Sequence, residues 1–228
     1  MSALTFTLKK NVTQQIDCRL LSPNNLADLS IVQIENLYLL NTKNAPKISD
    51  YFDVSGDDAN HIIFKSANQQ LDFIGFQMTN GQITIEGDCG DFLGTQMRGG
   101  IIICKGNAND RVGDQMRRGL ILVDGNAGDY CGSRMIAGTI GVFGKVGNYV
   151  GFAIKRGTIL LTQTPKLHAT LQNCGTHTLP FLALLFASFK GLSTRFNTVK
   201  NMRIQRYAGD LACNGNGEIL VCHTTISA

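Results

Sequence analysis

The side chains that most often act as nucleophiles, bases or metal ligands are scattered along this chain. It has seven cysteines and four histidines, but no Cys-x-x-Cys pair, no His-x-His and no His-Glu-x-x-His motif. No Gly-x-Ser-x-Gly or Walker sequence occurs, and Gly125–Gly132 (GNAGDYCG) is followed by no βαβ pattern that would make it a dinucleotide loop. The sequence therefore predicts no catalytic residue, no metal site and no cofactor within this chain.

Several cations recur at a regular spacing in the middle of the chain. Six of them fall near the same position of a repeat, with Asp114 as an acidic neighbour: Arg98, Arg117, Arg118, Arg134, Lys155 and Arg156. We call these six residues the basic stripe. The stripe is interpreted either as a solvated ridge or as a docking surface for an acidic partner or a polyanionic cofactor tail.

Composition limits the class of protein. The 228 residues are 43% hydrophobic and 17% charged, which excludes a disordered chain, and no 18-residue apolar run predicts a membrane span. The start, MSALTFTLKK, has no secretory h-region, and the odd number of cysteines is typical of free thiols, so we expect a cytoplasmic protein. A net charge of +4 without a Lys/Arg run longer than two does not favour nucleic acid.

A 19-residue repeat organises the middle of the chain. Glycine recurs at 75, 94, 113, 132 and 151, and again at 81, 100, 119, 138 and 157. Each repeat has one β-branched run bounded by glycine, and nineteen extended residues trace about 63 Å, which suits one coil of a β-solenoid. The sequence predicts an all-β fold, a right-handed parallel β-helix of 19-residue coils.

Four rows of the repeat are apolar and are predicted to point inward. One row is Ile83, Ile102, Ile121, Ile140 and Ile159, and the row two residues later contains Cys104. Another contains Met78, Met97, Met116 and Met135, which we interpret as internal packing rather than a copper site, because no cysteine or histidine shares it. A fourth contains Cys131, so Cys104 and Cys131 are predicted to be packing thiols. The aspartates at 91, 110 and 129 form a row with Asn148 that we expect to cap turns.

Apolar side chains also occupy rows that strand alternation places outside. These are Ile101, Ile103, Leu120, Leu122 and Leu160. An exposed apolar strip of this kind marks an interface, either with the C-terminal helix of the same chain or with a partner protein.

The flanks are predicted to cap the coils. Residues 1–53 form an N-terminal cap with a strand at Thr5–Lys9 and a short helix near Pro23–Leu29, and residues 54–168 form the β-helix, beginning with a degenerate coil. Residues 169–228 form a helix and strand extension. In it Leu179–Phe189 is apolar all round and predicts a buried helix, followed by strands at Met202–Tyr207 and Glu218–His223.

The iterated GxxMxxGxIxxxGxxG motif resembles the β-helical domain of the glutamate synthase large subunit. It is more similar to the C-type subunit of the formylmethanofuran dehydrogenase family, and most of all to the bacterial variant in the formyltransferase/hydrolase complex of methylotrophs. The terminal segments MSALTFTL and Arg206–Val221 (RYAGDLACNGNGEILV) extend this resemblance to nearly the whole chain.

The resemblance implies a non-catalytic scaffold subunit of a complex that passes a formyl group between tetrahydromethanopterin and a methanofuran-type cofactor and releases formate. It implies three other subunit types: zinc amidohydrolase-like, formyltransferase-like and dehydrogenase-B-like. Zinc, tetrahydromethanopterin and the methanofuran-type cofactor are expected in those partners. The basic stripe would then meet the glutamate chain that such cofactors carry.

Three alternatives remain. The chain is instead the C-type subunit of a molybdenum or tungsten formylmethanofuran dehydrogenase, a β-helical acyltransferase, or an unrelated structural adaptor. A left-handed acyltransferase helix needs coils of eighteen residues and a catalytic histidine, and His61, His168 and His177 have no supporting motif.

Overall fold

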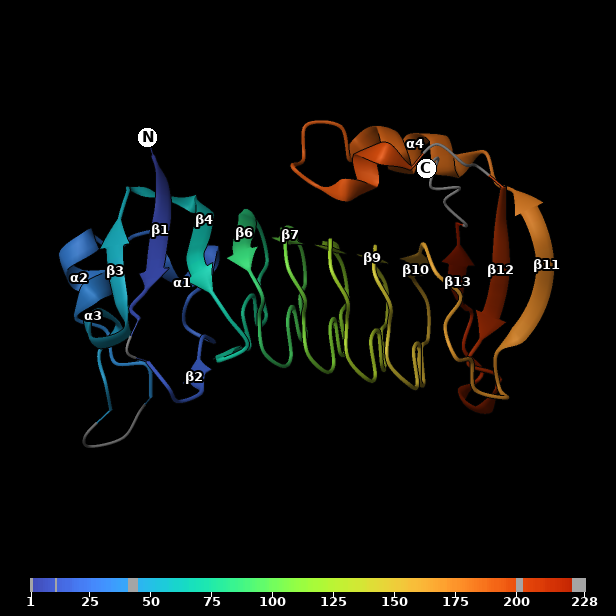
Figure 1. Ribbon diagram of the computed structural model, residues 1–228, viewed down its shortest axis with the longest axis horizontal. Helices are drawn as coiled ribbons and strands as arrows, with labels where there is room; N and C mark the ends of the chain where they lie inside the picture. Colours follow the sequence, from blue (N-terminus) through green and yellow to red (C-terminus); the bar gives the residue numbers. More distant parts are fainter. Residues whose placement is uncertain (1, 11, 41–44, 200–202, 223–228) are drawn as a thin grey trace.

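The structure is a computed structural model that describes residues 2–10, 12–40, 45–199 and 203–222. Most of its regular structure is strand, with a few short helices (Figure 1). Eleven strands form one sheet in the order β11-β12-β13-β10-β9-β8-β7-β6-β4-β1-β3, and two short strands, β2 and β5, form another. No described helix has the length and apolar character that crossing a membrane requires.

The repeat produces a row of parallel strands, one from each coil. They are β6 (Gln82–Gly87), β7 (Ile101–Cys104), β8 (Leu120–Val123), β9 (Thr139–Val142) and β10 (Thr158–Leu161). Each residue pairs with the residue nineteen positions later, so Ile102 lies between Ile83 and Ile121. The predicted stacking of this isoleucine row is confirmed.

The predicted inward rows are the core of the coils. The five members of the isoleucine row, the four methionines of the methionine row, and Cys104 are all 0% exposed, and Cys131 is 1% exposed. At Gly94 a Cβ atom would lie 2.4 Å from Cδ1 of Ile121, and φ is +63°. Only glycine lets this corner approach the isoleucine side chain so closely.

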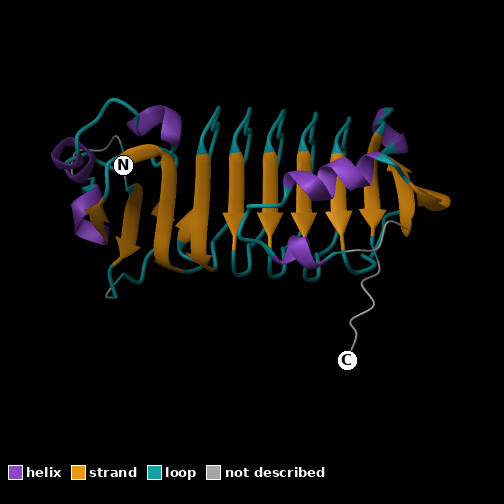
Figure 2. Cartoon of the chain, turned by 90° about the horizontal axis from the view of Figure 1, so that it is seen from above, coloured by secondary structure: helices purple, strands orange, loops and turns teal. Residues whose placement is uncertain are grey.

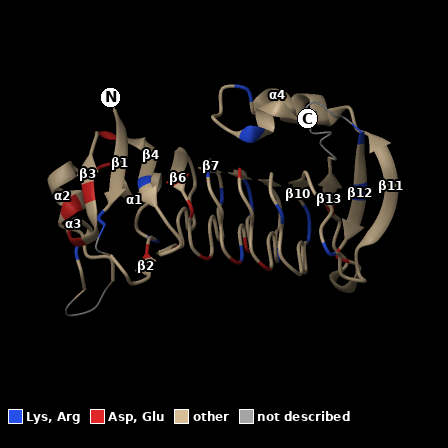
Figure 3. Ribbon diagram, viewed as in Figure 1, with Lys and Arg blue, Asp and Glu red and all other residues tan. Residues whose placement is uncertain are grey.

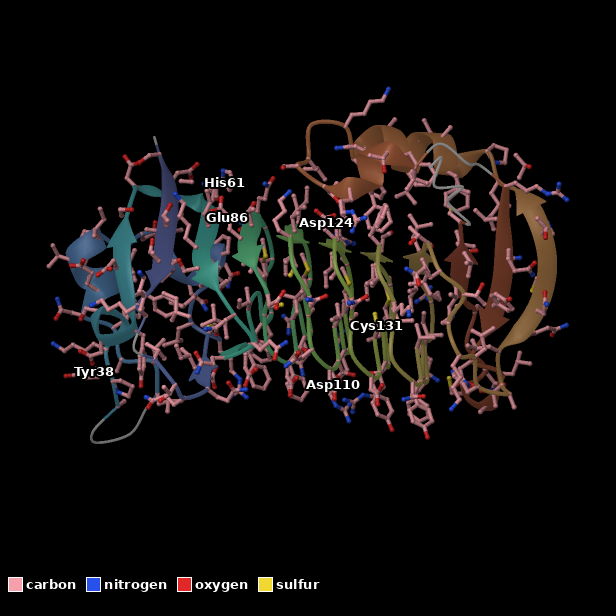
Figure 4. All side chains as sticks on the ribbon, in the orientation of Figure 1. Tyr38, His61, Glu86, Asp110, Asp124 and Cys131 are labelled. Atoms are coloured by element: carbon pink, nitrogen blue, oxygen red, sulfur yellow. The ribbon has the colours of Figure 1, made fainter. Side chains whose placement is uncertain are left out.

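A ladder of side-chain hydrogen bonds runs along one edge of the coils. The carboxylate of Asp91 accepts the backbone N–H of Asp110 at 3.1 Å, Asp110 accepts that of Asp129 at 2.8 Å, and Asp129 accepts that of Asn148 at 2.6 Å. Asp110 lies at this edge in Figure 4. The predicted capping role of the row is confirmed, because each side chain binds the coil that follows it.

The N-terminal end closes the stack with larger side chains. Strand β1 (Ala3–Leu8) lies between β3 (Phe52–Ser55) and β4 (Asp58–Ala67), which confirms the strand predicted there. The helices are α1 (Pro23–Leu26), as predicted, α2 (Ile31–Glu35) and α3 (Ile48–Tyr51), and the short strands are β2 (Ile16–Asp17) and β5 (Leu71–Asp72). Three buried aromatic rings pack together at this end, with centroids no more than 6.2 Å apart. They belong to Phe6, Phe52 and Phe64.

The C-terminal segment leaves the coils and then returns to them. After β11 (Gln172–Thr178), α4 (Phe181–Ser188) and the 3-10 helix η1 (Arg195–Thr198) lie over the row of strands, as Figures 1 and 2 both show. Strand β12 (Arg203–Gly209), the 3-10 helix η2 (Leu211–Cys213) and β13 (Gly217–Val221) follow. Both final strands are present where predicted; Met202 and His223 lie outside the described residues.

The prediction that Leu179–Phe189 forms a buried helix is wrong in its burial. Helix α4 buries Leu182, and Phe189 just after it is also buried, but Leu184 is 76% exposed and Phe181 is 41% exposed. A single helix lying on a flat strand face can bury only the side chains that point toward that face.

Asp124 anchors this segment to the coils. Its carboxylate is 4% exposed and accepts hydrogen bonds from Thr194 Oγ1 at 2.6 Å and from the N–H of Arg195 at 2.9 Å. The Arg195 guanidinium lies 4.0 Å from the ring centroid of Phe143. In Figure 4, Asp124 lies at the edge of the coils nearest this segment.

Candidate binding surface

Four cations of the basic stripe are free to meet a ligand or partner. Arg98, Arg117, Arg118 and Arg156 are exposed, and within the described ranges none makes a side-chain hydrogen bond or ion pair. They lie on the turns that precede β7, β8 and β10, whereas the turn before β9 has Ile136 and Ala137 at these positions; Figure 3 shows Lys and Arg along the coils. Strand spacing of about 4.8 Å separates neighbouring rungs of such a surface.

The other two members of the stripe are bound within the chain. The Arg134 guanidinium donates to both carboxylate oxygens of Asp114, at 2.6 and 3.0 Å, and Asp114 is 1% exposed. Asp114 also accepts from Ser133 Oγ at 2.6 Å. Lys155 donates to the backbone oxygen of Cys213 at 2.7 Å. Both contacts stabilise the fold. Asp114 balances the charge of Arg134, whereas Lys155 is exposed and its partner is a neutral carbonyl.

A groove at the N-terminal end of the stripe adds an arginine that the sequence did not reveal. Its volume is about 460 Å³, and its walls include Arg98 from one coil and Arg19 from the N-terminal cap. The Arg19 guanidinium lies 4.0 Å from the Phe73 ring centroid and 3.4 Å from the Asp17 carboxylate, which fix its direction. No periodicity links Arg19 to the repeat, so only the three-dimensional structure brings it to Arg98.

The outward apolar rows are largely covered by the chain itself. Leu122 and Leu160 are 0% exposed and form a second core with Phe189 and Phe196 of the C-terminal segment. Ile103 is also buried, at 1% exposure, whereas Ile101 and Leu120 are half-buried. For Leu122 and Leu160 the cover is thus intramolecular.

Four of the buried thiols have a raised pKa. Burial raises the pKa of Cys131 and of Cys222 to about 12, and burial also raises that of Cys18 well above its ordinary value. The Sγ atoms of Cys89 and Cys104 lie 3.8 Å apart, and this contact, with burial, raises the pKa of Cys89. A neutral thiol is a poor nucleophile, so these residues act as packing groups. Among the described residues no group of three or more His, Cys, Asp or Glu could hold a metal ion.

Comparison with known proteins points to one group of subunits. Over 92 residues, 40% of this chain and 34% of the relative, the chain is 30% identical to the C-type subunit of tungsten-containing formylmethanofuran dehydrogenase 2 of Methanococcus maripaludis. Over 86 residues, 38% of this chain and 32% of the relative, it is 29% identical to the C-type subunit of the formyltransferase/hydrolase complex Fhc of Methylorubrum extorquens. The resemblance to these C-type subunits is confirmed.

The similarity to the C-type subunits is partial. The chain matches about a third of the length of each curated relative, and no family profile matches it. A solved structure extends the likeness in fold: a chain of the formyltransferase/hydrolase complex of M. extorquens, in complex with methylofuran, aligns with a TM-score of 0.63. That alignment covers 96% of this chain and 100% of the other at 24% identity, so it speaks to the fold alone.

Proposed function

We propose that the chain is a scaffold subunit, without catalytic residues of its own, of a complex that passes a formyl group between tetrahydromethanopterin and a methanofuran-type cofactor and releases formate. The observation that carries this is the similarity of the repeat to two relatives that are both named as the C-type member of their assemblies. The stacking of 19-residue coils supports a right-handed parallel β-helix as the scaffold.

The proposed partners are the amidohydrolase-like, formyltransferase-like and dehydrogenase-B-like subunits, which would hold zinc and both cofactors in the cytoplasm. A complex of the molybdenum or tungsten formylmethanofuran dehydrogenase type is the second candidate. The chain is 30% identical to the tungsten-containing relative and 29% identical to the relative from the formyltransferase/hydrolase complex, so identity does not separate the two. The two candidates differ in whether a redox pterin subunit is present.

The test is purification of the affinity-tagged full chain from its native cell, followed by native mass spectrometry and metal analysis. We expect formyltransferase-like and amidohydrolase-like subunits in fixed ratio, with zinc. Molybdenum or tungsten in that ratio would favour the second candidate. A chain that elutes alone near 24.8 kDa would contradict both.

The exposed part of the basic stripe is proposed as a docking surface for a polyglutamate tail or an acidic rim of a partner. Replacing Arg98, Arg117 and Arg118 together with glutamine should weaken assembly or turnover several-fold at low salt and less at high salt. Each exposed pair contributes about 0–1 kcal/mol, and salt screens it.

A matched control removes the same charge elsewhere. Lys10, Lys65 and Lys190 are exposed, lie outside the stripe, and can be replaced together with glutamine. The control should behave as the wild type. Equal assembly and turnover of all three proteins at both salt concentrations would remove the docking role.

A further inference from the structure

Two ladders that run along the coils stop at the same cavity. The cavity has a volume of about 180 Å³ and is lined by Asn148, Tyr149, Lys166, Leu167 and His168. Residues 166–168 follow 147–149 by one 19-residue repeat, so the cavity lies where one coil should meet the next. No function described above uses it.

The first ladder is a stack of planar side chains. Phe73 and Phe92 stack with centroids 4.6 Å apart, the Arg111 guanidinium follows at 5.8 Å from Phe92 and 4.8 Å from Tyr130, and Tyr149 stacks on Tyr130 at 4.9 Å. Because each rung advances by one coil, Tyr130 covers one face of Tyr149 and the other face looks toward residues 166–168. Tyr149 is 48% exposed.

The second ladder is the row of hydrogen bonds that ends at Asn148. The Asn148 side chain donates to Asp129 at 3.2 Å, but within the described residues no donor reaches its Oδ1 atom, which in earlier coils would bind the N–H of the following rung. The backbone bridges beside it pair Cys89, Ala108, Ala127 and Val146 in turn. The next position is Pro165, which has no N–H to continue the series.

The lining of the cavity defines what it can hold. Lys166 is exposed and makes no side-chain hydrogen bond or ion pair within the part of the chain that is described, so it offers a free cation. The nearby carboxylate of Asp129 is already bound by Asn148. The imidazole of His168 is fixed by a 2.7 Å contact between Nδ1 and Thr170 Oγ1, and its Nε2 atom is buried with no hydrogen-bond partner among the described residues.

We propose that this cavity binds a small molecule with one planar aromatic ring, a negative group and a hydrogen-bond donor. The ring would become the next rung on the open face of Tyr149, the anion would pair with Lys166, and the donor would reach Asn148 Oδ1. A cavity on the order of 150 Å³ holds one benzene ring, which matches the volume here. This site is independent of the scaffold function.

The probe that tests the site is 4-hydroxybenzoate, titrated into the full chain and followed by calorimetry and saturation-transfer NMR. We expect saturable binding with a Kd on the order of 1 mM. The matched control ligand is trans-4-hydroxycyclohexanecarboxylate, which keeps both polar groups and loses the flat ring. It should bind at least about fivefold more weakly, as expected when an aromatic contact is lost. Equal affinity for the two ligands, or no saturable binding of 4-hydroxybenzoate, would overturn the proposal, and this test needs only the wild-type protein.

Variants then locate the site. Tyr149→Leu should weaken binding about fivefold, Tyr149→Phe should retain it, and Lys166→Gln should weaken it and remove its salt dependence. Tyr38 is 56% exposed and lies at the opposite end of the molecule (Figure 4), so Tyr38→Leu is the control. Melting curves establish that each variant is folded. Unchanged binding by a folded Tyr149→Leu protein would show that the ring binds elsewhere.

Discussion

Ile121→Asp is expected to yield little soluble native protein. Ile121 is 0% exposed and pairs in register with Ile102 on one side and Ile140 on the other. An aspartate there would bury a carboxylate among apolar side chains with no partner, at a cost of several kcal/mol. It would also remove the apolar contacts of the isoleucine, which typically adds about 2–5 kcal/mol. Because whole domains are stable by only about 5–15 kcal/mol, the coils should not close around this charge.

The measurements are soluble yield, circular dichroism and the melting temperature. Two controls separate burial of charge from other effects. Ile121→Val removes one methylene group and should cost about 0.5–1.5 kcal/mol. Thr139→Asp places the same charge on the neighbouring strand at a half-buried, outward position, and should leave a folded protein. A wild-type melting temperature for Ile121→Asp would mean that the isoleucine row is not interior.

The isoleucine row also shows why the coils could be predicted from sequence. Each coil pairs with the coil nineteen residues later, so a position that needs the same residue type in every coil shows that type at every nineteenth residue. Ile121 and the corner glycines can therefore be recognised by counting. One structural requirement was not visible in this way. Phe92, Arg111, Tyr130 and Tyr149 all adopt positive φ, between 59° and 63°, although none is glycine. The conformation costs energy in non-glycine residues, and only the structure shows the stacking that accompanies it.

Which cations of the candidate surface remain free was harder to predict, because this depends on contacts between segments that share no period. Counting places Arg98 and Arg117 in one row and Arg118 in the next, and it puts Arg134 two residues before the first of these rows; it does not reveal that Arg134 is bound to the buried Asp114. Similarly, the position of Arg19 against the coils follows from the path of the N-terminal cap. The burial of α4 was predicted wrongly because apolar composition does not say how many faces a neighbouring layer can cover.

Asp210 closes the C-terminal end of the stack by replacing a backbone group that a further coil would supply. In earlier coils the N–H at this corner binds a backbone oxygen of the next coil, as Gln115 binds Ser133 at 2.9 Å. At the last coil the N–H of Ala153 binds the Asp210 carboxylate instead, at 3.0 Å, and the same carboxylate accepts the N–H of Ala212 at 3.0 Å. Asp210 is 3% exposed.

Asp210→Ala is therefore expected to destabilise the last coil by about 1.5–3 kcal/mol, because it removes hydrogen bonds to a charged acceptor, which contribute on this order. Asp210→Asn keeps one acceptor oxygen and should lose about half as much. Coils at one end of a repeat protein open separately from the others, so the decisive measurement is hydrogen exchange at residues 150–161 and 217–221. Exchange there should accelerate in Asp210→Ala, while that of the strands at 82–87 and 101–104 stays unchanged.

The effect should also depend on pH in a defined direction. Burial alone would raise the pKa of Asp210, but hydrogen bonds from the Thr170 side chain and from the N–H groups of Ala153 and Ala212 outweigh it and hold the pKa below its ordinary value. A carboxylate with a lowered pKa stabilises the fold above about pH 4 and loses that contribution as the pH falls through the folded pKa. The difference between wild type and Asp210→Ala should thus be full at pH 7 and shrink on acidification. A difference that is absent at pH 7, or that grows as the pH falls, would show that the carboxylate does not close the stack.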